Sequence, residues 1–161
     1  MPSKGRYPLR KNLLIKDAKI NECVKLVDKL FANISTETIK NIINNVKSRI
    51  LICSSLKNDK NIVGCLIFKI HIGLCAEILL MGVEKKIQTK GIGSFLVNGL
   101  KKIIPKYTNS IYVKSDLYCT RFYKKNGFTE CIRIPSKFTK NIIFKTTESI
   151  QMECRREDCN F

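Results

Sequence analysis

Gln88-Thr89-Lys90-Gly91-Ile92-Gly93 is the stretch of sequence that decides the fold. It lies between an apolar run at residues 76–83 and residues 94–104, where apolar side chains recur at helical spacing. This order predicts a strand, a tight turn and a helix. Because glycine has no Cβ, backbone N–H groups at the turn can converge on an anion near the positive end of the helix. The turn suits a pyrophosphate, although similar turns often only connect two elements.

Two further motifs flank this turn in a fixed order. Ala76-Glu77-Ile78 lies eleven residues before Gln88, and Phe122-Tyr123-Lys124-Lys125-Asn126-Gly127-Phe128 follows the helix. With these motifs the chain resembles the GNAT acetyltransferase superfamily, whose signatures are Gln/Arg-x-x-Gly-x-Gly/Ala and a downstream Phe-Tyr-x-x-x-Gly-Phe. Within it, the chain is most similar to the catalytic domain of Gcn5-type histone acetyltransferases. The motifs cover residues 76–128, and a looser similarity of element order covers residues 13–155.

The predicted fold class is α/β, a GNAT-like mixed and mostly antiparallel sheet with helices on both faces. Hydrophobic residues make up 44% of the 161 residues, which fits one globular domain at residues 13–155. A loose basic arm at residues 1–12 and a tail at 156–161 would flank it. Apolar periodicity and turn signals place the elements as follows. Helices are expected at residues 20–34, 36–46, 91–104 and 116–126, and strands at 49–56, 62–72, 76–83, 110–114, 128–134 and 150–155, with a hairpin loop at 57–61.

The chain shows no apolar segment long enough for a signal peptide or a membrane span, so we expect a nuclear or cytoplasmic protein with no membrane partner. The eight cysteines form no Cys-x-x-Cys pair and have one histidine, His71, to join them. A metal site is therefore not expected. We expect reduced cysteines that act as small core residues, with Cys159 as the free thiol.

The formal charge of +17 raises the possibility of nucleic-acid binding. Lysine dominates the positive residues and accompanies abundant isoleucine and asparagine, so compositional bias and solvated lysine faces are the favoured interpretation. Part of the positive charge would still help to bind an anionic cosubstrate. Five lysines flank the proposed site: Lys85, Lys86, Lys90, Lys124 and Lys125.

Glu77 is an acidic residue within an otherwise apolar strand. A carboxylate there either faces solvent by strand alternation or has a function. The resemblance implies the function, because this position matches the general base of the family. A lysine ammonium must lose a proton before it attacks a thioester, at a cost of about 4.6 kcal/mol at pH 7. A partly desolvated carboxylate would accept that proton.

The resemblance also implies the remaining site residues. A backbone N–H of Met81-Gly82-Val83 would stabilise charge on the thioester carbonyl, with Gly82 permitting a local bulge, unless this glycine merely ends the strand. Tyr123 would be the general acid for the leaving thiolate, or simply a packing residue, and Tyr118 would line the lysine side of the groove. Gcn5-type enzymes have Tyr-Phe where this chain has Phe122-Tyr123. The expected acetyl-CoA-binding residues are Met81, Gly82, Val83, Gln88, Thr89, Lys90, Gly91, Ile92, Gly93, Ser94, Phe122 and Tyr123.

The leading hypothesis is a protein lysine N-acetyltransferase that uses acetyl-CoA, with a histone tail as acceptor and chromatin-modifying complex subunits as partners. A basic body should repel a basic tail unless Glu77, Asp116, Glu130 and Glu148 gather near the groove. The alternatives are a GNAT enzyme for another amine, such as a protein N-terminus or an amino sugar, and a catalytically idle nucleosome- or nucleic-acid-binding module. His71 is assigned no role, and residues 135–149, least like the family, leave the acceptor open.

Overall fold

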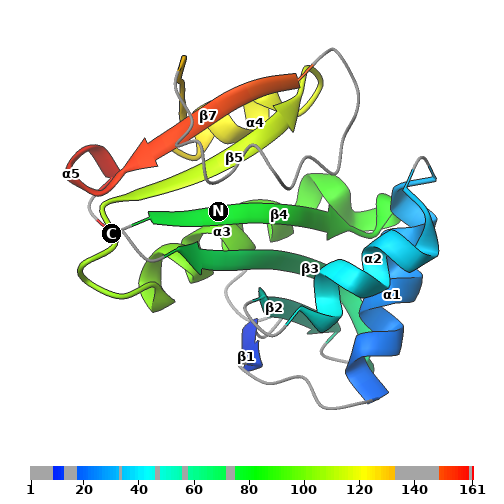
Figure 1. Ribbon diagram of the computed structural model, residues 1–161. Helices are drawn as coiled ribbons and strands as arrows, with labels where there is room; N and C mark the ends of the chain where they lie inside the picture. Colours follow the sequence, from blue (N-terminus) through cyan, green and yellow to red (C-terminus); the bar gives the residue numbers. More distant parts are fainter. Residues whose placement is uncertain are drawn as a thin grey trace.

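The computed structural model describes residues 9–12, 18–32, 34–45, 48–55, 58–71, 75–132, 149–159 and 161. Within them the chain forms one sheet with the strand order β1-β2-β3-β4-β5-β7-β6 (Figure 1). Neighbouring strands are antiparallel except for the parallel pair β4 and β5. The strands are β1 (Leu9–Asn12), β2 (Ser48–Ser55), β3 (Asn58–His71), β4 (Cys75–Val83), β5 (Ser110–Asp116), β6 (Thr129–Glu130) and β7 (Ser149–Arg155). The predicted mixed, mostly antiparallel sheet is confirmed.

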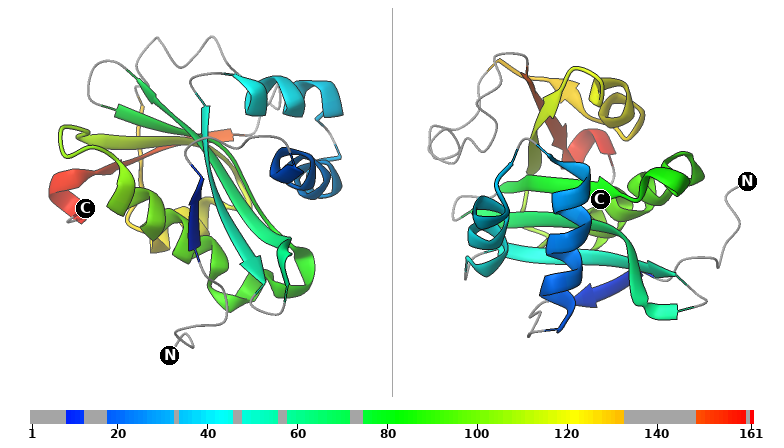
Figure 2. Two further views of the ribbon diagram at one scale, coloured as in Figure 1. Left: turned by 90° about the horizontal axis from the view of Figure 1, so that it is seen from below. Right: turned by 90° about the vertical axis from the view of Figure 1, so that its right-hand side faces the viewer.

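Helices cover both faces of the sheet (Figure 2). On one face, α1 (Ala18–Leu30) and α2 (Thr36–Asn44) pack on β2, β3 and part of β4 through a buried cluster that includes Val27, Ile39 and Leu80. On the other face, α3 (Ile92–Ile103) and α4 (Thr120–Lys125) pack on the centre of the sheet through a second cluster. Ser35 caps α2, because its hydroxyl accepts a hydrogen bond from the Thr38 N–H at 3.2 Å. The predicted helices on both faces are confirmed.

Several element limits differ from the sequence-based expectation. Leu9–Asn12 pairs with β2 as an edge strand, although residues 1–12 were expected to form a loose arm. The strand β3 begins at Asn58, inside the expected loop at 57–61, because register shifts at Ser54 let polar residues join the hairpin. Of the strand expected at 128–134, β6 comprises Thr129–Glu130, and residues 133–148 lie outside the described part. The domain limits stay a prediction.

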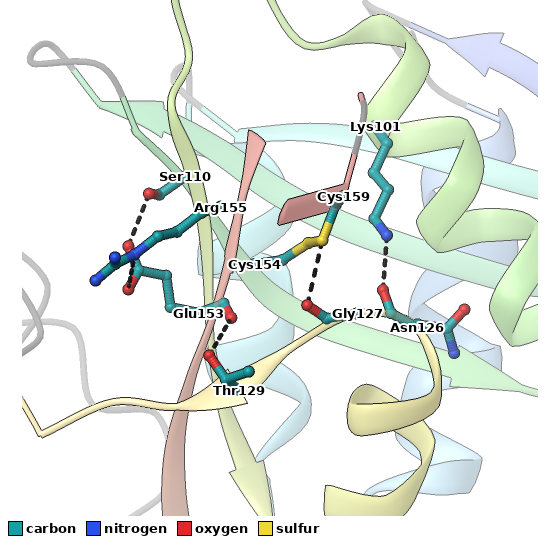
Figure 3. Close-up of a disulfide and its surroundings, with 9 residues drawn as sticks. All are labelled: Lys101, Ser110, Asn126, Gly127, Thr129, Glu153, Cys154, Arg155 and Cys159. Carbon is teal, nitrogen blue, oxygen red and sulfur yellow. Dashed lines mark hydrogen bonds and ion pairs between the residues drawn. A yellow bond between two sulfur atoms is a disulfide. The ribbon is translucent and has the colours of Figure 1, made fainter. Parts of the chain in front are cut away.

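The C-terminal segment is folded onto the domain, which corrects the expected tail at 156–161. Arg156 in α5 (Arg156–Cys159) donates hydrogen bonds to the carbonyl oxygens of Pro105 and Thr108, at 2.9 and 2.8 Å. Cys159 forms a disulfide with Cys154, so the prediction that it is a free thiol is wrong (Figure 3). The single turn of α5 returns the chain towards β7 and brings the two Cα atoms to 6.7 Å, a distance that a disulfide can span.

Among the described residues, no helix has both the length and the apolar character needed to cross a bilayer.

Candidate active site

The parallel strands β4 and β5 pair over only four residues each. Their register ends at Ile78 and Val113, and beyond that point the two strands diverge towards the right of Figure 1. The divergence opens a cleft that is partly open to solvent. The cleft is lined by Phe31, Ile78, Leu79, Leu80, Met81, Val113, Lys114, Ser115, Asp116, Cys119, Tyr123 and Ser149. Strand edges without a partner strand leave backbone groups that can bind an extended ligand.

A bulge in β4 lies beside this cleft. Phe68 pairs with Ile78 and Ile67 pairs with Leu80, so Leu79 is the extra residue. Leu79 and Leu80 consequently both pack towards α1 and α2. The bulge was expected at Gly82, which instead pairs regularly with Cys65. Gly82 has a packing role, because a Cβ there would lie 2.7 Å from Leu30 Cδ1.

Glu77 lies on β4 directly before the divergence, with a side chain that is 14% exposed. Burial raises the pKa of Glu77 to about 7, against the opposing effect of the Lys69 charge. Its Oε2 lies 2.8 Å from His71 Nε2, a contact that the sequence did not reveal. The β3–β4 register puts both side chains on the same sheet face, so His71 has a polar partner after all. In the sequence, Glu77 was identified as a candidate because it is an acidic residue within an otherwise apolar strand.

The proposed pyrophosphate turn lies at the start of α3. The 3₁₀ helix η1 (Lys85–Lys90) leads into Gly91, which has φ 81° and precedes the first residue of α3. Other residues rarely adopt this left-handed conformation. Apart from Gly91 and its two chain neighbours, no heavy atom of the described residues lies within 4 Å of the position of a Gly91 Cβ, so the backbone there is open to a ligand. The Gln88 side chain donates to the Val83 carbonyl at 3.1 Å and closes the turn.

Close packing of α3 against α4 joins the two sequence motifs. A Cβ at Gly93 would lie 3.0 Å from the Phe122 ring, so this glycine allows the two helices to approach each other. The next residue, Tyr123, is buried and lines the cleft. Burial raises the pKa of Tyr123, so its phenol stays protonated at neutral pH.

The other predicted site residues are spread more widely. Met81 lines the cleft, Ile92 is buried in the core and Ser94 is partly buried. Tyr118 is 96% exposed and is not among the residues that line the cleft. Lys90 is exposed, and the Thr89 side chain lies outside the described part of the structure.

The acidic residues that were expected to gather do so only in part. Asp116 lines the cleft, whereas Glu130 forms an ion pair with Lys124 at 2.6 Å on the surface. Glu148 lies outside the described residues. A different carboxylate, Glu153 on β7, is buried in the sheet beside β5. No sequence pattern singled out Glu153, because its neighbours on β5 are more than forty residues away in the chain.

The fold and site combine three features that suit an acyltransferase: a split parallel strand pair, a helix start with open backbone and a buried carboxylate. The family model described as acetyltransferase (GNAT) domain matches residues 49–130, about half of the chain. The chain therefore belongs to the GNAT family of acetyl-CoA-dependent N-acetyltransferases. No curated protein sequence matches it significantly.

Solved structures of several acetyltransferases share the fold. Tetrahymena Gcn5 is 20% identical with a TM-score of 0.74, over 92% of this chain and 94% of Gcn5. N-acetylglutamate synthase from Neisseria gonorrhoeae is 18% identical with a TM-score of 0.73, over 95% of this chain and 36% of the synthase. An aminoglycoside 6'-N-acetyltransferase complexed with coenzyme A is 16% identical with a TM-score of 0.69, over 92% and 96%. These similarities concern the fold.

Acetyl-CoA is the cosubstrate, and the site fits it. The open backbone at Gly91 and the start of the twelve-residue helix α3 would provide N–H groups for its pyrophosphate. The divergent edges of β4 and β5 line the cleft, which begins at Ile78, the residue after Glu77, and reaches Tyr123 of α4. Among the described residues, no group of three or more His, Cys, Asp or Glu side chains is arranged to hold a metal ion.

Proposed function

We propose that this protein is a lysine N-acetyltransferase of the Gcn5-like kind, with Glu77 as the general base. The observation that carries the proposal is the buried Glu77 carboxyl with its pKa near 7, next to the point where β4 and β5 diverge. A base with a pKa near the working pH accepts protons most effectively. Acetyl-CoA would supply an activated acetyl group as a thioester at the end of the cleft.

Glu77 would take a proton from the acceptor ammonium, directly or through a water molecule. The neutral amine then forms a bond to the acetyl carbon while the carbon–sulfur bond breaks. Because Lys69 shares the sheet face with Glu77, its charge would favour the ionised form of the Glu77 carboxyl before the amine binds. Proton transfer of this type contributes typically about 10²–10⁴ to the rate.

Two other groups would complete the transfer. A backbone N–H of the Leu79–Met81 segment, which lies in the cleft beyond the last β4–β5 pair, would stabilise the negative charge that develops on the carbonyl oxygen. The Tyr123 phenol, protonated and lining the cleft, would give its proton to the departing sulfur. Three exposed lysines of η1 would attract the phosphates of the cosubstrate: Lys85, Lys86 and Lys90.

The proposed acceptor is a lysine on a basic protein tail, as in histones, with chromatin-modifying complex subunits as partners and a nuclear location. Support comes from the Ala-Glu-Ile motif and from the similarity of the fold to Gcn5. Enzymes for amino acids and aminoglycosides share the fold equally well, so the test includes other amines.

The test compares acetyl transfer to a histone-tail peptide, to a peptide with only an N-terminal amine, and to glucosamine 6-phosphate. Wild type and Glu77→Gln are assayed between pH 6 and pH 9, with the exposed Glu37→Gln as a matched control. We expect the tail peptide to react fastest. We expect kcat/KM of the wild type to rise through about pH 7 as Glu77 ionises, and Glu77→Gln to lose at least about 10²-fold.

Each other outcome has a definite meaning. Faster reaction with either of the other amines removes the histone assignment and leaves the base assignment in place. Equal activity of Glu77→Gln and wild type removes Glu77 as the base. Absence of transfer to all three amines, together with tight and salt-sensitive DNA binding, would favour the nucleic-acid-binding alternative.

A further inference from the structure

His71 lies directly beside the proposed base. It is the last residue of β3 and pairs with Cys75, while Lys69 of the same strand pairs with Glu77 on β4. Because side chains alternate along a strand, Lys69, His71 and Glu77 point to the same sheet face. The His71 Nε2 lies 2.8 Å from the Glu77 Oε2, and the two side chains are only 10% and 14% exposed. A hydrogen bond so well shielded from water is stronger than one on the surface.

The chemistry of the two groups sets the direction of this hydrogen bond when Glu77 is ionised. A carboxylate oxygen can only accept, so the Nε2 of His71 carries the proton and donates to Oε2. A donor of this kind stabilises the charged form of a carboxyl group. The part of the chain that the structure describes makes no other hydrogen bond to the Glu77 carboxyl, so Oε1 is left for the acceptor amine.

Other titratable groups share this sheet face but bear less directly on the Glu77 carboxyl. Lys69 acts on it through its charge. The α1 helix packs farther along β4, at Leu80, through apolar side chains, and α3 covers the opposite face. The groups on the Glu77 face, besides His71, are Lys69 on β3, Cys75 on β4, Tyr112 and Lys114 on β5, and Glu153 and Arg155 on β7. Within the described residues, only His71 has a side-chain hydrogen bond to Glu77.

We propose that His71 is the positioning residue of the base: its Nε2–H holds the Glu77 carboxylate at Oε2, stabilises the ionised form and leaves Oε1 to take the proton of the amine. This inference rests on the proposed function, because it takes Glu77 to be the base. Without the donor, burial would keep more of the carboxyl protonated at neutral pH, and a protonated carboxyl cannot act as a base. His71 thus acts through Glu77.

The first test measures kcat/KM between pH 6 and pH 9, with whichever of the three amines the wild type acetylates fastest. His71→Phe keeps a flat ring and removes the donor. We expect the midpoint of the rise in kcat/KM to move from about pH 7 to about pH 8, because a hydrogen bond to a charged group corresponds to about one pKa unit. Activity should therefore fall about tenfold at pH 6 and approach the wild-type value at pH 9.

His71→Gln is the matched control, because its amide N–H₂ still donates a hydrogen bond but does not titrate. We expect its midpoint to stay near pH 7, and the KM of acetyl-CoA to be unchanged in both variants. A purely structural role of His71 predicts an equal loss at every pH. An unmoved midpoint in His71→Phe overturns the proposal, as does a midpoint in His71→Gln that moves as far as that of His71→Phe.

The second test needs no turnover. His71 is the single histidine of the chain, so its imidazole gives one set of NMR signals that can be followed with pH. In Glu77→Gln the midpoint of this titration should move to lower pH, because the carboxylate that favours the imidazolium is absent. An unchanged titration overturns the proposed contact.

The two tests together separate this proposal from the proposed function. If Glu77→Gln keeps full activity although the imidazole titration moves, the hydrogen bond stands, while the base assignment and the positioning role of His71 are both overturned. If Glu77→Gln is inactive and the midpoint of His71→Phe does not move, Glu77 remains the base and the role of His71 is overturned. Turnover of none of the three amines counts against the proposed function and against the role of His71 alike.

Discussion

At the scale of single residues, the candidate site depends on a carboxyl group whose ionised form is disfavoured by burial. Glu77 is mostly buried and His71 is its neighbour at 2.8 Å. Burial of this kind destabilises the folded protein whenever the carboxyl is ionised. Proteins accept such a cost at functional sites, where a base with a raised pKa is useful.

The pH dependence of stability follows from this shift. The pKa of Glu77 is 4.5 in the unfolded chain and about 7 in the folded one, so the folded state binds more protons between these values. Stability is therefore lost as the pH rises from 4.5 to 7. We expect Glu77→Gln to match wild type near pH 4 and to exceed it by about 1–2 kcal/mol at pH 8, after allowance for solvent screening. Urea unfolding of wild type and Glu77→Gln at pH 4 and pH 8 measures this difference in the free energy of unfolding.

The same experiment on Glu37→Gln provides the comparison, since exposed substitutions usually change stability by less than about 0.5 kcal/mol. A Glu77→Gln variant that is less stable than wild type at pH 8 would show that the carboxylate is stabilised by its neighbours, with Lys69 and His71 outweighing burial.

At the scale of elements, one close contact between α3 and α4 joins the proposed pyrophosphate turn to the Phe122-Tyr123 motif. Gly93 near the start of α3 meets the Phe122 ring of α4, and Lys101 of α3 donates to the Asn126 carbonyl at 2.6 Å (Figure 3). Tyr123 follows Phe122 and reaches the cleft. A shift of α4 relative to α3 would therefore move both a wall of the cleft and the proposed proton donor.

We expect Gly93→Ala to disturb this contact. Overpacking costs about 1–3 kcal/mol, and alanine regains up to about 1 kcal/mol through its higher helix propensity, so a net loss of about 1 kcal/mol is expected. The KM of acetyl-CoA should rise about fivefold, a loss of about 1 kcal/mol in binding. Urea unfolding and steady-state kinetics measure the two effects.

Asn98→Ala, at an exposed position of the same helix, is the control; it should leave the KM of acetyl-CoA unchanged and raise stability by about 0.5 kcal/mol through the higher helix propensity of alanine. Adding Phe122→Leu to Gly93→Ala should recover part of both losses, because the smaller side chain makes room for the new methyl group. If Gly93→Ala binds acetyl-CoA as tightly as wild type, the contact between Gly93 and Phe122 does not position the proposed pyrophosphate turn.

At the scale of the whole molecule, the charge of +17 acts oppositely on the two substrates. Acetyl-CoA is anionic and is attracted to the protein body, whereas a basic tail is repelled. Ionic strength screens both effects, since the Debye length falls to about 10 Å at 0.1 M salt. The buried Glu77 and Glu153 do not form an extended acidic surface, because Lys69 and Arg155 lie beside them.

Salt should therefore change the two KM values in opposite directions. Between about 20 and 200 mM salt, we expect the KM of acetyl-CoA to rise several-fold and the KM of a basic tail peptide to fall. Steady-state kinetics at fixed pH measures both, and a peptide without net charge serves as the control acceptor. A tail-peptide KM that rises with salt would indicate that an acidic groove attracts the tail despite the net charge.

Local patterns in the sequence determined a large part of this protein. The glycines at 91 and 93, the apolar periodicity of α3 and the lone acid in β4 predicted the turn, the helix and the candidate base. These features depend on residues close in the chain, so their conformational preferences are readable there. The resemblance to the GNAT superfamily rested on the same local motifs.

Only the tertiary structure decided which distant residues meet. The bulge at Leu79, the contact of His71 with Glu77 and the Tyr112–Glu153 bond all depend on strand register, and so does the disulfide between Cys154 and Cys159 on the turn of α5. Register is set by the simultaneous burial of both sheet faces and by the paths of the connections between strands. A shift of one residue would turn each of these side chains to the opposite face, and no pattern along the chain specifies that shift.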